Sequence, residues 1–283
     1  MSATTWNFPT WQCRDKGALV SPRASAGGAF TSNTVALADN SMFGVFSFLL
    51  RSGKTADGNE LQYLTSIGKQ NGTDAAMGIY LNHNVSGDSK LTILFYDVVG
   101  GAYRHLYLFG DEDGTSWLKE DKWYQIAFTA TTTAFQWMIN GSATATQGTA
   151  TTVAGNLNLQ DSSERWWHAC PAASWNKTDP YTITSQWPSV VLGPSAWDAT
   201  VQDLTDTAVS GRIFDANGDF IYPGANGSLW FNDAYTTTAG YKPDVYMNDG
   251  SPRFDNGSYT VVWDSTSGLG FSDSPGGLRK FYE

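Results

Sequence analysis

The sequence predicts an all-β protein, and three observations lead to this prediction. Short apolar segments of period 2 recur along the chain, as expected of strands whose side chains alternate between two faces. Turn pairs such as Asn-Gly, Asp-Gly and Pro-Gly separate these segments. Charged helix formers are scarce, because the 283 residues include only five Glu and nine Lys.

The clearest single pattern is a hairpin over residues 123–141. Residues 123–129 alternate between two kinds of side chain, and a Thr-rich run leads from them to a second strand over 135–139. The pair Asn140-Gly141 then suits a tight turn, because both residues tolerate positive φ. We expect Trp123 and Ile126 to lie in the core of this hairpin.

The other strands are expected wherever a short apolar run is bounded by Gly, Asn, Asp or Pro. In chain order these segments are 17–20, 34–37, 42–51, 61–67, 76–82, 90–98, 103–109, 156–159 and 189–192, and 201–212 is expected as a strand followed by a short turn.

The hairpin pattern, Trp-x-x-Ile-x-Phe-Thr followed some ten residues later by Ile-Asn-Gly, resembles the signature of laminin-G-like and pentraxin-like domains. These domains belong to the concanavalin A-like lectin and glucanase superfamily. The resemblance covers roughly residues 40–212 and implies a jelly-roll β-sandwich. We therefore predict an irregular N-terminal arm (1–40), a β-sandwich (41–213) and a small β-rich C-terminal extension (214–283), which either widens the sandwich or forms a second module.

The charge balance limits the classes of partner. The net charge is −10, and no run of Lys or Arg offers a basic surface for nucleic acid or for an anionic membrane. The first 17 residues lack the basic and apolar regions of a signal peptide, which favours synthesis in a host cytoplasm. Cys13 and Cys170 form no metal motif, and a disulfide between them stays open.

Candidate chemistry is sparse. The paired glutamates of jelly-roll glucanases are missing, so the sequence predicts no catalytic residues and a protein that is not an enzyme. The acidic run 111–113 is expected to be a solvated turn. Asp215, Asn217 and Asp219 have calcium-loop spacing, but a turn with local backbone bonds is the preferred interpretation, and no metal or cofactor is assigned. The three histidines, on separate segments, are expected to be surface or structural residues.

The unusual feature is a Trp-rich insertion over 164–197. Long loops in compact domains often carry function, and Trp rings both stack on sugars and anchor protein interfaces. A satellite core that folds the insertion onto the sandwich is the third interpretation. The candidate ligand or interface residues are Arg165, Trp166, Trp167, His168, Trp175, Tyr181 and Trp187.

The sequence therefore predicts a virion protein with a lectin-like domain that adheres to glycans. The aromatic strands and tight turns from Ile213 onward are similar in style to those of tailed-phage virion proteins with lectin-like domains. A capsid decoration, head-fibre or tail component would have itself or other virion proteins as partners. The alternatives are a free carbohydrate-binding lectin and a glycan hydrolase with a non-standard acid pair.

Overall fold

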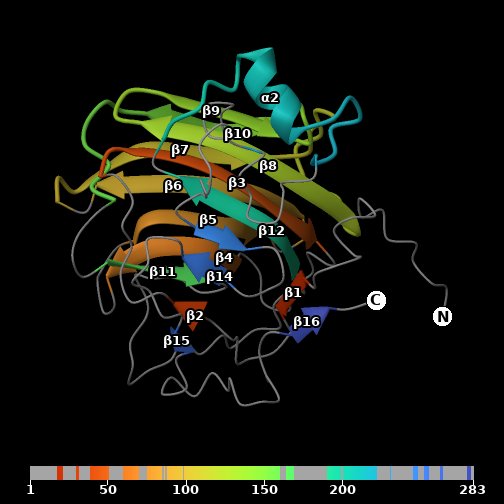
Figure 1. Ribbon diagram of the computed structural model, residues 1–283, viewed down its shortest axis with the longest axis horizontal. Coiled ribbons are helices and arrows are strands. Elements are labelled where there is room, and N and C mark those ends of the chain that lie inside the picture. The colour runs from red at the N-terminus through yellow and green to blue at the C-terminus, as the bar shows by residue number, and fades with distance from the viewer. Residues whose placement is uncertain are drawn as a thin grey trace, which may run out of the picture.

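Two antiparallel sheets face each other in the computed structural model of the chain (Figure 1). The structure describes residues 18–21, 30–31, 39–50, 60–69, 75–84, 86, 88–97, 99–159, 164–168, 190–198, 200–221, 230, 245–247, 252–254, 262–263 and 279–281. Every strand pair among these residues is antiparallel. The predicted all-β sandwich is confirmed.

Sheet A contains eight of the described strands, in the order β14-β13-β12-β3-β8-β9, with β1 between β12 and β16. Its strands are β1 (Ala18–Ser21), β3 (Ser41–Leu50), β8 (Lys122–Thr131), β9 (Phe135–Ile139), β12 (Val190–Asp198), β13 (Val245–Met247), β14 (Pro252–Phe254) and β16 (Arg279–Phe281).

Sheet B also contains eight described strands, in the order β10-β7-β6-β5-β4-β11-β2-β15. They are β2 (Phe30–Thr31), β4 (Glu60–Lys69), β5 (Ala75–His83), β6 (Ser89–Asp97), β7 (Ala102–Phe109), β10 (Gln147–Thr152), β11 (Glu164–His168) and β15 (Val262–Trp263). Strands from the C-terminal part thus pair within both sheets, while the domain boundaries at 40 and 213 stay predictions.

The main core lies between the two sheets. Alternate residues of β8, namely Tyr124, Ile126 and Phe128, are fully buried in it. Ile126 therefore occupies the expected core position. Trp123 is 8% exposed but has the opposite parity in the strand, so it lies on the outer face of sheet A.

Strand β3 is buried on both faces. Its alternate residues Phe46 and Phe48 join the inter-sheet core, whereas Phe43 and Val45 join a second apolar cluster on the outer face of sheet A. This explains the nearly continuous apolar run of β3, because a strand covered on both sides needs no polar face. At Gly44 an added Cβ would lie 2.4 Å from the Trp197 ring, so only glycine fits there.

The second cluster is completed by the chain after β12. Helix α2 (Thr207–Ile213) lies against the outer face of sheet A (Figure 1) and buries Val209 and Ile213 on it. Phe220 and Trp230 add two aromatic rings, 4.8 Å apart between centroids. No described helix has the length and apolar character needed to cross a membrane.

Several predicted segments differ from the observed ones. The strand expected over 156–159 is an irregular segment that buries Leu157 and Leu159, because their amides bond to the loop before β3. The segment expected as strand and turn over 201–212 contains α2 instead, capped where the Asp206 carboxylate accepts the Ala208 amide at 2.8 Å. Strand β10 was not predicted, and the strand expected over 34–37 lies outside the described residues.

Candidate functional site

The sequence-predicted aromatic site is only partly described. Strand β11 carries four of its residues and pairs with β4 and β2, with Trp166 opposite Ile67 and Trp167 opposite Ser66. These four are Arg165, Trp166, Trp167 and His168. Trp175, Tyr181 and Trp187 lie outside the described residues, so this site stays a prediction.

The far end of the same Trp-rich region belongs to the core. Trp197 is fully buried, and its ring lies 5.6 Å from that of Phe46 and 5.8 Å from that of Phe128 between centroids. Strand β12 therefore ends the predicted insertion as part of sheet A. Trp197 therefore belongs to the inter-sheet core, and this side chain is not available to a ligand.

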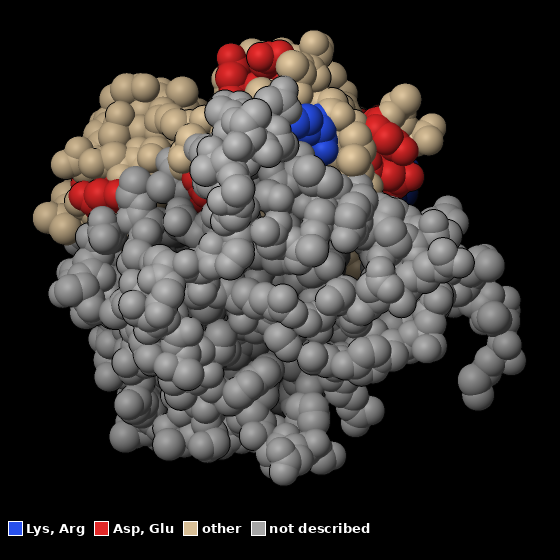
Figure 2. Space-filling model, in the orientation of Figure 1, with Lys and Arg blue, Asp and Glu red and all other residues tan. Residues whose placement is uncertain are grey.

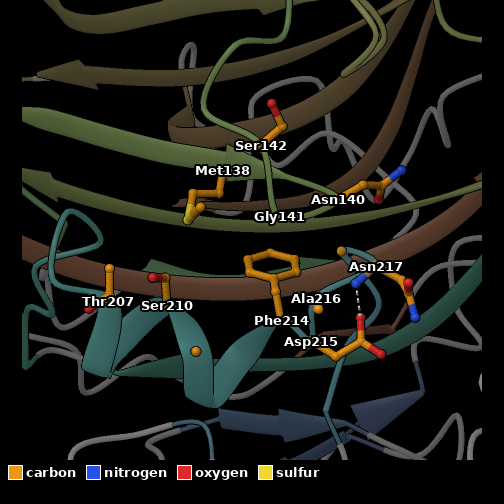
Figure 3. Close-up of a pocket in the computed structure, with 12 residues that line it drawn as sticks. Met138, Asn140, Gly141, Ser142, Thr207, Ser210, Phe214, Asp215, Ala216 and Asn217 are labelled. Carbon is orange, nitrogen blue, oxygen red and sulfur yellow. Dashed lines mark hydrogen bonds between the residues drawn. The ribbon is translucent and has the colours of Figure 1, made fainter.

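A groove of about 450 Å³ lies between the turn after β9 and the segment that contains α2 (Figure 3). Its volume falls within the range of small-molecule sites. The wall from the hairpin is formed by Met138, Asn140, Gly141 and Ser142, and the opposite wall by Thr207, Ser210, Gly211, Phe214, Asp215, Ala216, Asn217 and Gly218. The Phe214 ring points toward Gly141 between the two walls (Figure 3).

Helix α2 presents one stripe to this groove. Thr207, Ser210 and Gly211 follow the spacing i, i+3 and i+4, which places them on one side of the helix. Two hydroxyl groups therefore line the groove from the helix, and Phe214 lines it from the residue directly after the helix. An added Cβ at Gly211 would meet no atom within 4 Å, so the groove is open at this position.

The side chain of Asp215 stabilises the turn that follows α2. Asp215 Oδ1 accepts the amides of Asn217 at 2.8 Å and of Asp219 at 3.0 Å. These are the local backbone bonds expected from the sequence. The described residues contain no cluster of three or more His, Cys, Asp and Glu arranged to hold a metal ion.

Gln125 connects this turn to sheet A. Its side chain is 3% exposed, its Nε2 donates to Asp219 Oδ1 at 3.1 Å, and its Oε1 accepts the amide of Phe220. The backbone N–H of Gln125 donates to Asn140 Oδ1 at 2.7 Å. One buried glutamine thus fixes both walls of the groove relative to each other.

The two walls also touch directly at Gly218. This residue has φ +85°, and an added Cβ would lie 2.1 Å from the Asn140 carbonyl oxygen. We expect Gly218→Ala to separate the turn from the hairpin and to cost about 1–3 kcal/mol of unfolding free energy, because both the positive φ and the contact disfavour a side chain. Chemical denaturation measures this loss. Asn217→Ala, an exposed change in the same turn, should be nearly neutral, and equal stability of the two variants would contradict the close approach.

A charged cluster lies at the start of β8. The Asp111 side chain is completely buried, and its carboxylate lies 2.8 Å from Lys122 Nζ and 3.1 Å from Lys119 Nζ. The expected solvated turn is therefore wrong for Asp111, because two lysines neutralise it inside the structure. Glu112 also pairs with Lys122, whereas Asp113 pairs with Lys119 at the surface.

The buried Asp111 and the partly exposed Glu112 titrate differently. Burial and the hydrogen bond to Asp111 raise the pKa of Glu112. Burial would raise the pKa of Asp111 as well, but hydrogen bonds from Glu112 and both lysines outweigh it and lower that pKa. Lys122, which pairs with both acids, is the first residue of β8, so the cluster lies at the start of that strand.

Two histidines are structural, as expected. His83 and His105 are fully buried. His105 Nε2 lies 2.7 Å from the Thr131 carbonyl oxygen, which joins β7 of one sheet to β8 of the other. Burial lowers the pKa of His105, against the effect of that hydrogen bond. His168 lies in β11, and its side chain is outside the described residues.

No known protein-family profile and no curated protein sequence matches the chain. Among solved structures, it is similar to a heptameric SAP-like pentraxin from Limulus polyphemus, with 10% identity and a TM-score of 0.46 over 90% of this chain and 98% of the pentraxin. It is similar to the enzymatically active domain of bacteriophage CBA120 tailspike protein 2, with 13% identity and a TM-score of 0.43 over 68% and 26%. It is also similar to an alginate lyase from Alteromonas sp. 272, with 8% identity and a TM-score of 0.37 over 65% and 88%.

These comparisons correct one prediction. The prediction that the chain is not an enzyme is wrong as it was drawn, because the similar structures include proteins named as enzymes. The missing pair of glutamates excludes one glucanase mechanism and does not exclude catalysis. Since every TM-score lies below 0.5, the substrates of these proteins give no argument about the chemistry of this chain.

Proposed function

We propose that this chain is a saccharide-binding β-sandwich and that the groove between the hairpin turn and α2 is its binding site. The observation that carries this proposal is the lining of the groove. Hydroxyl groups of Ser210 and Thr207, the amide of Asn217 and the carboxylate of Asp215 line it, while the Phe214 ring is 5% exposed and packs against Phe220 in the second apolar cluster. Saccharides offer several hydroxyl groups to such polar partners.

The groove also has the construction of a pre-formed site. Gln125 and the close approach of Gly218 to Asn140 hold its two walls together. A site whose walls are already fixed loses less conformational entropy when a ligand binds. The polar groups of the rim therefore face a ligand in a defined arrangement.

Gly211 allows this proposal to be tested without disturbing the fold. Gly211→Trp should fill the groove, because the position opens into it, and should weaken saccharide binding roughly tenfold or more. A glycan array identifies the bound sugars, and isothermal titration calorimetry with the best of them measures the affinity.

Gly211→Ala is the matched control. It should keep the binding affinity and raise the unfolding free energy by about 0.5–1 kcal/mol, because alanine favours a helix more than glycine does. Saccharide binding that Gly211→Trp leaves unchanged would refute the groove as the site, and an array with no bound sugar would refute the function.

We further propose that this binding serves a tailed-phage virion, with the chain as a capsid decoration, head-fibre or tail component. The support is the succession of aromatic strands and tight turns after Ile213. Other virion proteins or further copies of the chain would be its partners. A virion component should purify with particles in a fixed ratio, whereas a free lectin should be absent from them.

A further inference from the structure

Acidic side chains dominate the surface around the groove. Asp215 lines the groove, Asp206 directly precedes the lining residue Thr207, and Asp219 directly follows Gly218. All three aspartates are exposed. In Figure 2, acidic side chains gather at the top of the described surface, where Figure 1 places α2.

The carboxylate of Asp215 is fixed at the rim of the groove. Its Oδ1 accepts two backbone amides of its own turn, and its Oδ2 takes part in neither bond. The charge therefore cannot swing away from a ligand without breaking the turn. A bound saccharide would meet this charge at close range.

Neighbouring Lys and Arg side chains do not neutralise the negative charge around the groove. Arg212 lies outside the stripe by which α2 lines the groove. Lys122 is paired with Asp111 and Glu112, in a cluster where the three acids Asp111–Asp113 face only two lysines. The described surroundings of the groove are thus negative overall, as is the whole chain, with a net charge of −10.

From this placement of charge, we infer that the groove selects neutral and amino saccharides and rejects uronates. The inference rests on the proposed function and names the ligand class of the same site. Two unit charges about 4 Å apart in water interact by about 1 kcal/mol, which corresponds to roughly a fivefold change in affinity. Asp215 alone should therefore disfavour a carboxylate-bearing sugar by about that factor.

Two pairs of oligosaccharides test the selection by charge. Within each pair the sugar chain is the same and only the charged groups differ. A hexamer of galacturonic acid is compared as its neutral methyl ester and in the de-esterified anionic form. A chitin hexamer is compared with the deacetylated, cationic chitosan hexamer. Calorimetry with each probe should give tighter binding for the methyl ester than for the acid, and for chitosan than for chitin.

Asp215→Asn should reduce the preference for the neutral over the anionic hexamer roughly fivefold. The asparagine keeps Oδ1 as acceptor for the turn, so the groove should persist. Asp88→Asn removes the same charge from the turn between β5 and β6 of sheet B and should leave the preference unchanged. About 1 M salt should also reduce the preference, because it screens charges beyond about 3 Å.

The outcomes separate this inference from the proposed function. If the acid binds as tightly as its ester, or Asp215→Asn leaves the preference unchanged, the inference is wrong, while loss of binding in Gly211→Trp still supports the groove as a saccharide site. If none of the four hexamers binds, the inference is wrong; if the glycan array also shows no sugar whose binding Gly211→Trp weakens, the proposed function is wrong as well.

Discussion

Phe128→Ala should lower the unfolding free energy by about 3–5 kcal/mol, the range for removing a large buried aromatic side chain. Phe128 is fully buried, and its ring lies 6.3 Å from Phe46, 5.8 Å from Trp197, 5.9 Å from Phe95 and 5.7 Å from Phe135 between centroids. Phe95 belongs to sheet B and the other three to sheet A, so the substitution leaves a cavity where the two sheets meet.

Urea denaturation followed by Trp fluorescence measures this loss. Tyr103→Ala is the matched control, since this aromatic side chain is 53% exposed and its removal should change stability by only about 0.5 kcal/mol. Similar midpoints for Phe128→Ala and the parent protein would contradict the position of Phe128 between the sheets.

The part of the fold that could be predicted is the part with local signals. Strands β8 and β9 show period 2, and the turn pair that follows β9, Asn140 and Gly141, does adopt positive φ values of 46° and 73°. Both signals lie within a short stretch of sequence, so no distant contact was needed to recognise them. The strands of sheet B from β4 to β7 were found for the same reason.

The missed elements lack such signals. Strand β10 has the sequence QGTATT at the edge of sheet B, and most of its residues are exposed, so no apolar alternation marks it. Helix α2 is only seven residues long, and its position depends on burying Val209 and Ile213 against sheet A. The N-cap Asp206 was its one local signal.

The groove could not be predicted, because its walls are distant in sequence. Gln125 reaches the amide of Phe220, 95 residues later, and no pattern announces this bond. A polar residue amid the apolar neighbours of a buried strand was the available hint, since a buried amide side chain needs hydrogen-bond partners. In the Trp-rich region, composition alone does not separate a core residue such as Trp197 from a binding residue.

Acid should destabilise the protein through His83. This side chain is fully buried, Nδ1 lies 2.6 Å from Ser89 Oγ, and Nε2 has no hydrogen-bond partner within the described part of the chain. Burial therefore lowers the pKa of His83 to about 4, from 6.5 in the unfolded chain. Between these values the unfolded state binds a proton that the folded state does not, so stability falls as the pH decreases from 6.5 to 4.

The full loss expected from His83 is about 3 kcal/mol, and stability should not depend on this group above pH 6.5. Urea denaturation at a series of pH values from 7 to 4 measures the slope. His83→Asn removes the titrating group while keeping a polar side chain near Ser89, so it should be less stable at pH 7 but should lose less stability on acidification. His105 and the carboxylates titrate in both proteins, and the difference between the two slopes therefore isolates His83. Parallel pH profiles would show that His83 is not held neutral in the folded state.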